Sequence, residues 1–336
     1  MSAGYGYLNA RVRGLRAQLL PAGFLTDQLD ASGFAGFASA LAQTSYGRDR
    51  EEAQAEGAGL AAVDAALARG FVRTTRALLG SADGTPRALI ALLLRRYDLA
   101  NLKAIVRARH AERGAEDVLA AVLPAGDLTA KTLRGMAEAA DLAAAGQVLA
   151  LSGHPLAEAF RKGVAAYADD GDLLAFEMAL DRAFYAGWSA DAERLPAPEG
   201  FRAYIATEVD ATNVRTALKL RGRPVEAARF FVAGGRLVSA STFAELVAQP
   251  VGTPLPALRG PFAALADAST PGEADTRLRA VLDGLARRLG GDPLDIGLVA
   301  DYLRRKEQET ARLRLIARGV FYGVPRAALV KELGDA

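Results

Sequence analysis

A polar signature that recurs inside apolar helical segments is the strongest constraint on the fold of this chain. An acidic residue is followed three positions later by Asn or Arg, and five positions later by a basic residue. The pattern occurs at three places, whose acidic residues lie 112 and 99 positions apart. Recurrence at a spacing of roughly 100 residues indicates related structural units. The signature consists of Asp98, Asn101 and Lys103, then Asp210, Asn213 and Arg215, then Glu309, Arg312 and Arg314.

A second landmark supports the same register. His154-Pro155-Leu156 resembles Thr253-Pro254-Leu255, which lies 99 positions later, and each proline precedes an acidic residue of the signature by 55 positions. In the first unit that spacing leads to a turn at 44–47. A shorter echo, Asn9 with Arg11, lies near the start of the chain. We therefore expect an N-terminal helix at 1–20 that packs on the body, and helical units at 21–110, 111–222 and 223–336.

The signature is unusual because Asp and Asn compete for backbone hydrogen bonds and are mediocre residues in a helix interior. The acidic residue and the Asn or Arg are three positions apart, so they share a helix face. We expect inter-helix hydrogen bonds or ion pairs that fix how the units pack. The alternative is that the signature residues are surface charges that recur by chance. A catalytic triad of carboxylates is disfavoured, because acid–base chemistry needs an asymmetric pair and a pocket.

Apolar spacing predicts helices almost throughout the chain. Leu8, Val12, Leu15 and Leu19 form one helical face before Pro21, and similar faces occur at 60–71 and 278–289. Alternating strand patterns are scarce, and Gly/Pro-rich breaks are short. The sequence therefore predicts an all-α fold of many short helices.

Composition excludes several classes of protein. The 336 residues are 51% hydrophobic and 24% charged, with a net charge of +2, which gives no basic field for nucleic acid. The absence of cysteine excludes disulfides and thiolate sites. The two longest chargeless stretches, 31–47 and 142–157, are too short and polar to span a bilayer. Contact with a membrane is therefore expected only through a partner.

Motifs for catalysis or nucleotide binding are missing. The sequence has no P-loop, no His-Glu-x-x-His helix and no Gly-x-Ser-x-Gly elbow. The two histidines, His110 and His154, are far apart in sequence and are expected to be structural. We expect no catalytic, cofactor-binding or metal-binding residues.

At the signature segments the chain resembles the V-type ATPase subunit family called C in bacteria and archaea and d in eukaryotes, in particular its Thermus and Deinococcus type. The matching segments are 7–13, 96–102, 208–215, 307–318 and 321–323. The resemblance implies three homologous helical domains around a pseudo-threefold axis, which form a funnel with a central cavity. It also implies one face on the proteolipid rotor ring, a cavity that receives the central shaft, and no catalytic residues.

The resemblance gives the first functional hypothesis: a non-catalytic central-stalk subunit, one copy per complex, at the cytoplasmic face of the membrane and monomeric in isolation. A generic helical repeat scaffold or adaptor shares every compositional feature and is the alternative. An enzyme that uses only carboxylates is a third hypothesis, which the missing motifs disfavour.

Overall fold

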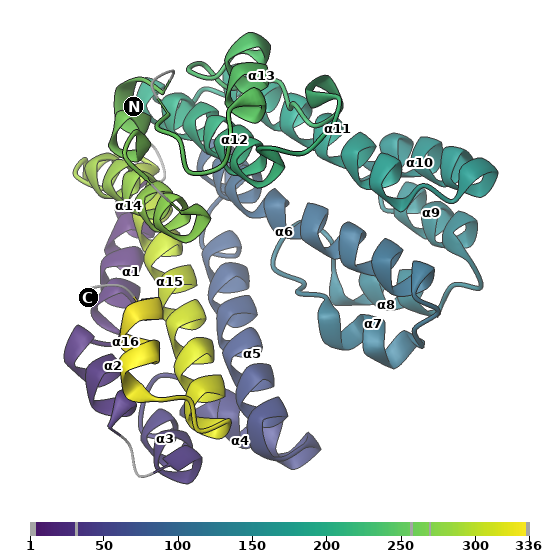
Figure 1. The fold of residues 1–336 in the computed structure, drawn as a ribbon. Coiled ribbons are helices and arrows are strands. Elements are labelled where there is room, and N and C mark those ends of the chain that lie inside the picture. Colours follow the sequence, from purple (N-terminus) through teal and green to yellow (C-terminus); the bar gives the residue numbers. More distant parts are fainter. Residues whose placement is uncertain (1–4, 31–32, 256–257, 269, 334–336) are drawn as a thin grey trace. The chain divides into compact units, whose positions relative to one another are not determined.

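The computed structural model describes residues 5–30, 33–255, 258–268 and 270–333, and these residues form helices joined by short loops (Figure 1). Sixteen α-helices and two 3₁₀ helices occur in the described ranges, with no strand among them. The all-α prediction is confirmed. None of the helices in these ranges is both long and apolar enough to span a membrane.

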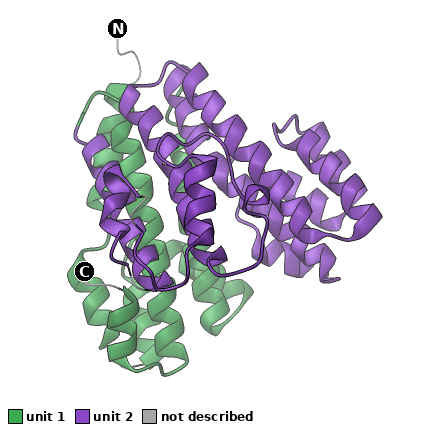
Figure 2. Cartoon of the chain, turned by 45° about the horizontal axis from the view of Figure 1, so that its top comes forward, with its two compact units in different colours: residues 1–83, 292–336 green, residues 84–291 purple. Residues whose placement is uncertain are grey.

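The chain divides into two compact units, and the first combines an N-terminal and a C-terminal segment of the sequence (Figure 2). Unit 1 combines residues 1–83 with 292–336, and unit 2 is residues 84–291. The expected division at 20, 110 and 222 concerns internal repeats, which this partition does not test. The helices of unit 1 are α1 (Tyr5–Ala17), α2 (Ala22–Leu29), α3 (Gly33–Ala42), α4 (Gly47–Glu56), α5 (Gly59–Leu79), α15 (Gly297–Phe321) and α16 (Arg326–Leu333).

Unit 1 is organised around the long helix α15. This helix packs against α1, α2, α3, α5 and α16, while α4 packs against α3 and α5. The apolar residues at their contact include Phe37, Leu41, Leu67, Leu313 and Ile316, all fully buried. The core of unit 1 is therefore made by two segments from opposite ends of the sequence.

Unit 2 contains two further long helices, α6 and α12, that carry the first two copies of the signature. Helix α6 packs against α7, α8 and α11, and helix α12 packs against α11, α13 and α14. One apolar core lies between α12, α13 and α14 and contains Val214, Phe243, Leu246 and Leu278. The helices of unit 2 are α6 (Gly84–His110), α7 (Ala115–Ala121), α8 (Ala130–Glu138), α9 (Leu142–Leu151), α10 (Ala157–Asp170), α11 (Leu173–Arg194), α12 (Glu199–Leu220), η1 (Ala227–Arg229), α13 (Ala240–Ala248), η2 (Gly260–Leu265) and α14 (Pro271–Leu289).

Side-chain caps fix where several helices of unit 2 begin. Thr129, Asp141, Asp172, Ser239 and Thr270 each accept a hydrogen bond from a backbone N–H in the first turn of the helix that follows. A cap satisfies one of the amides that the first turn leaves without a helical partner. Two of these caps, Thr129 and Ser239, begin the short helices that lie beside the acidic signature residues.

Candidate functional site

Asp98, the first acidic residue of the signature, is completely buried in α6 and binds the loop before α8. Its carboxylate accepts backbone N–H bonds from Asp127 at 2.7 Å and Leu128 at 3.1 Å. His154 Nε2 lies 3.4 Å from the same carboxylate, while its Nδ1 accepts a hydrogen bond from the Leu156 amide. A Cβ on Gly126 would overlap the carboxylate, so this loop can approach only with glycine there.

Asp210, the second acidic residue, has the same kind of environment in α12. Its oxygens accept N–H bonds from Arg236, Leu237 and Val238, each at 2.9 Å. A Cβ on Gly235 would overlap the carboxylate. Burial raises the pKa of Asp210, and the three amide donors oppose that rise.

Glu309, the third acidic residue, is 6% exposed in α15 and binds a segment from the start of the chain. The Leu20 amide donates to Glu309 Oε2 at 2.5 Å. The Tyr46 hydroxyl donates to Glu309 Oε1 at 2.9 Å, and Lys306 Nζ donates to the same oxygen at 2.7 Å. Glu309 thus accepts one backbone amide where the two aspartates accept two and three.

The three carboxylates share one local arrangement. The amides of Leu128, Val238 and Leu20 each lie two residues before a short helix, namely α8, α13 and α2. A negative charge near a helix N-terminus is favourable, because it faces the positive end of the helix dipole. Each acidic residue therefore binds the backbone just before a short helix and holds it against the long helix that carries the signature.

The asparagines of the signature bind the same loops farther upstream. Asn101 exchanges two hydrogen bonds with the backbone of Leu123, both at 2.7 Å. Asn213 does the same with Val232, at 2.8 and 3.0 Å. Both side chains are buried, and each pairs its donor and its acceptor with the backbone C=O and N–H of a single residue. In the described ranges, the half-buried Arg312 takes no part in an equivalent contact.

The basic residues of the first two signature copies each form an ion pair with a neighbouring helix of unit 2. Lys103 of α6 lies 2.8 Å from Asp181 of α11, and Arg215 of α12 lies 2.8 Å from Asp275 of α14. Burial raises the pKa of Asp181, and Lys103 opposes this. Burial would also raise the pKa of Asp275, but the Arg215 hydrogen bond and nearby cations lower it overall.

The third basic residue makes a weaker contact of the same kind. Arg314 of α15 lies 3.7 Å from Asp64 of α5, and Arg318, one turn later, lies 3.1 Å from the same carboxylate. The N-terminal echo differs in its two members. Asn9 is buried and donates to the carbonyls of Pro293 and Asp295 at 2.7 and 3.0 Å, whereas Arg11 is exposed.

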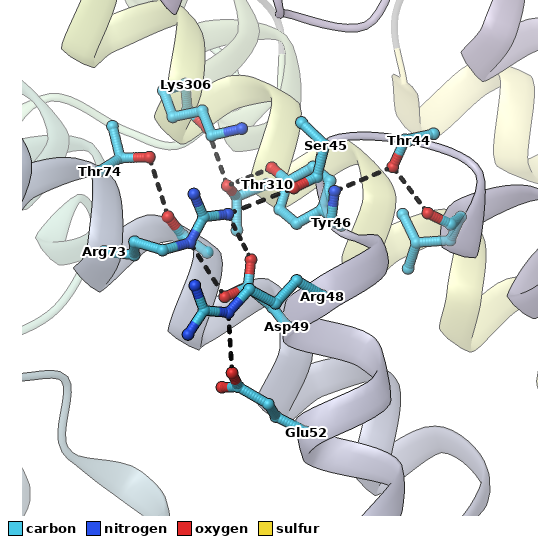
Figure 3. A network of polar contacts seen from close by, with 12 residues as sticks. Thr44, Ser45, Tyr46, Arg48, Asp49, Glu52, Arg73, Thr74, Lys306 and Thr310 are labelled. Atoms are coloured by element: carbon cyan, nitrogen blue, oxygen red, sulfur yellow. Dashed lines mark hydrogen bonds and ion pairs between the residues drawn. The ribbon is translucent and has the colours of Figure 1, made fainter.

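A polar network surrounds Tyr46 between α15, α4 and α5 (Figure 3). Lys306 Nζ lies 4.2 Å from the centre of the Tyr46 ring, and burial lowers the pKa of Lys306 although Glu309 opposes this. Arg73 forms an ion pair with the buried Asp49 at 2.6 Å. Burial, followed by the charge of Glu309, raises the pKa of Tyr46, so its hydroxyl stays a donor.

The polar side chains described above attach loops and neighbouring helices to the long helices. The acidic side chains are occupied by amides, a hydroxyl or cations, and the described ranges contain no group of three potential metal ligands. An open cavity of about 640 Å³ beside Arg109, Leu142 and Tyr167 is lined by none of the signature residues. Asp98 and Asp210 belong to unit 2, and Glu309 belongs to unit 1. Each holds its own loop.

Sequence reasoning missed two of the residues that complete these sites and the partner of a third. Gly126 and Gly235 permit close approach to the aspartates, and His154 contacts Asp98 from a turn. The shared Gly-x-Leu run at 126–128 and 235–237 was an available signal. The 55-residue proline spacing located the His154 turn without identifying its partner.

Comparison with known proteins places the sequence in a family. The family model described as ATP synthase (C/AC39) subunit matches residues 8–332. The V-type ATP synthase subunit designated C in Thermus thermophilus is 39% identical over 99% of this chain and 99% of its own length. The V-type ATP synthase subunit of the same designation in Deinococcus radiodurans is 35% identical over 98% and 91%. The A-type ATP synthase subunit designated C in Halorubrum lacusprofundi is 28% identical over 97% and 96%.

Proposed function

The chain belongs to the ATP synthase (C/AC39) subunit family, and we propose that it is the non-catalytic subunit that joins the rotor ring to the central shaft of a V-type ATPase. The observation that carries the proposal is the extent of the family match, from residue 8 to residue 332. A match of this length applies to the whole chain rather than to one domain.

In this proposal one surface binds the proteolipid ring and another binds the central shaft subunits. One copy serves each complex, at the cytoplasmic face of the membrane, and the chain contacts the membrane only through the ring. Three related units around an axis suit a part that sits on a ring and turns with it, and units that differ in sequence can hold a single shaft in one orientation.

The helix-to-helix bridges support a role in transmitting torque. Charged side chains connect α6 with α11, α12 with α14, and α15 with α5. Buried carboxylates and amides fasten the intervening loops to the long helices. Such contacts resist sliding of one helix past another, because sliding would leave buried polar groups without partners.

The experiment is removal of this chain from the complex. Membranes lacking it should retain their rotor rings but lose the catalytic head, and ATP-driven ion pumping should fall to background. Adding back the wild-type chain should restore both attachment and pumping. The purified chain alone should not hydrolyse ATP.

Coupled pumping in membranes without the chain would overturn the proposal and favour the generic scaffold. ATP hydrolysis by the purified chain that a point substitution within it abolishes would overturn the non-catalytic part alone.

A further inference from the structure

The third acidic residue differs from the other two in where its loop comes from. Asp98 binds the Leu128 amide 30 positions later, and Asp210 binds the Val238 amide 28 positions later. Glu309 binds the Leu20 amide, 289 positions earlier. A local chain segment therefore tethers the first two contacts, while the third joins opposite ends of the sequence.

The helices around α15 repeat the order of neighbours seen around α6. In unit 2, α6 packs on α7, α7 on α8, α10 on α11, and α11 back on α6. In unit 1, α15 packs on α16, α16 on α2, α4 on α5, and α5 back on α15. In unit 1, α16 is the last helix and α2 follows α1 near the start of the sequence, whereas in unit 2 α7 continues directly into α8. Unit 1 thus has the organisation of one repeat whose first part is C-terminal and whose second part is N-terminal.

Helix α1 is anchored next to α15: Leu8 and Val12 are completely buried, Asn9 bonds to two carbonyls just before α15, and Arg16 lies 3.3 Å from Asp301. The segment 18–30, which follows α1, contains α2 and is called the N-terminal strap below, is held to the C-terminal helices more weakly. Asp30 pairs with Arg326 of α16 at 2.7 Å, but both side chains are more than half exposed. Exposed pairs contribute little to stability because solvent screens them.

Apolar burial by the strap is also modest. Among its apolar side chains, helix α2 buries only Leu25 and leaves Phe24 and Leu29 half-buried, whereas its counterpart α13 buries Phe243, Leu246 and Val247. Local opening is easiest where few apolar contacts are lost. The cost of closing a loop also rises with the length of chain between the contacts, so a distant partner is recovered less readily.

We propose that the N-terminal strap is a releasable closure: it detaches from α15 and α16 while unit 2 remains folded. Detachment exposes Glu309, whose remaining partners, Lys306 and Tyr46, stay in place. The other two acidic sites have no such opening, because their loops continue directly from the signature helices. The inference concerns this chain alone and does not depend on the proposed coupling role.

Hydrogen exchange on the full chain tests the proposal, since α2, α8 and α13 are short helices of matched length. After correction for intrinsic rates, the amides in the last turn of α2 should exchange about tenfold or more faster than those of α8 and α13. Equal protection of the three helices would overturn the proposal.

A cross-link provides the second arm. The chain contains no cysteine, so an Asp30→Cys, Arg326→Cys variant offers one defined pair of thiols for a flexible bismaleimide. The cross-link should slow exchange in α2 by about tenfold or more and leave α8 and α13 unchanged. The same variant capped with a monofunctional maleimide is the control. Unchanged exchange in α2 after cross-linking would mean that the strap does not open.

A matched pair of substitutions covers the case in which the cysteine variant does not fold. Glu309→Gln weakens the bond to the Leu20 amide and should speed exchange in the strap. Asp98→Asn weakens the corresponding bonds to the loop before α8 and should leave the strap unaffected. Faster strap exchange in both variants, or in neither, would contradict the proposal.

Discussion

At the scale of residues, the buried carboxylates show how backbone N–H donors replace the water that would hydrate an exposed carboxylate. Asp98 and Asp210 are completely buried, and each accepts backbone amides from one loop. Burial nevertheless raises the pKa of Asp210, so its three amide donors replace hydration only in part. Removing a partner from such a site costs more than removing an exposed ion pair, because the remaining group stays buried and unsatisfied.

Substitution of the signature asparagines tests how much a buried backbone group loses when its partner is removed. Asn213→Leu should lower the free energy of unfolding by about 1–3 kcal/mol, because the Val232 amide and carbonyl lose their partner inside the protein. Asn101→Leu should do the same through Leu123. Urea denaturation followed by circular dichroism measures both changes, with the helix content of the folded state unaltered.

Arg312 occupies the same signature position and serves as the control. It is half-buried and takes no part in an equivalent bond in the described ranges, so Arg312→Leu should change stability by less than about 0.5 kcal/mol. An equal loss at all three positions would indicate that the signature acts through helix propensity rather than through the loops.

At the scale of elements, periodicity was sufficient to predict the helices but not their partners. The apolar face at 278–289 predicts a helix that ends at Gly290, and α14 ends at Leu289. The signature identified Asp98 and Asp210 in the sequence. The amides that they bind lie 26–30 positions away, in loops that show no periodic sequence pattern from which their path could be predicted. Glu309 is the extreme case, because its Leu20 partner lies at the other end of the sequence.

Two glycines determine whether these loops can dock. Gly126→Ala and Gly235→Ala should each destabilise the protein by about 1–3 kcal/mol, because the added methyl overlaps a buried carboxylate and forces the loop away. Thermal and urea unfolding measure the loss. Hydrogen exchange should report it first in α8 for the former substitution and in α13 for the latter.

Gly187 of α11 is the matched control, since it is exposed and an added Cβ would meet nothing within 4 Å. Gly187→Ala should stabilise the helix by about 0.5–1 kcal/mol, as alanine has the higher helix propensity. Stabilisation by all three substitutions would show that the carboxylates tolerate displacement and that the loops are not fastened as described.

At the scale of the whole molecule, chain connectivity and compact units do not coincide. Unit 2 is one continuous segment, whereas unit 1 is assembled from residues 1–83 and 292–336. The C-terminal helices of unit 1 must therefore meet partners made hundreds of residues earlier. Contacts with such large sequence separation form late, because the chain between them must first be ordered.

A circular permutant would make both units continuous. In a chain that begins at Gly84 and ends at Asp83, with a flexible Gly/Ser linker of about 25 residues from Leu333 to Tyr5, residues 292–333 run directly into 5–83. Such a linker has a typical end-to-end distance of about 25–30 Å. We expect a folded protein with native helix content and stability equal to or above that of the natural chain, because the strap is now tethered next to α16.

A second permutant with the same linker, opened at the exposed Gly171 between α10 and α11, is the comparison. It leaves unit 1 continuous but cuts the helices around α6 into two separated segments, so the contacts of α11 with α6 and α10 become distant in sequence. This variant should be less stable and should refold more slowly than the one opened at 83–84. Equal stability and refolding rates for the two permutants would mean that repeat boundaries do not govern assembly, and the split-repeat description of unit 1 would then fail.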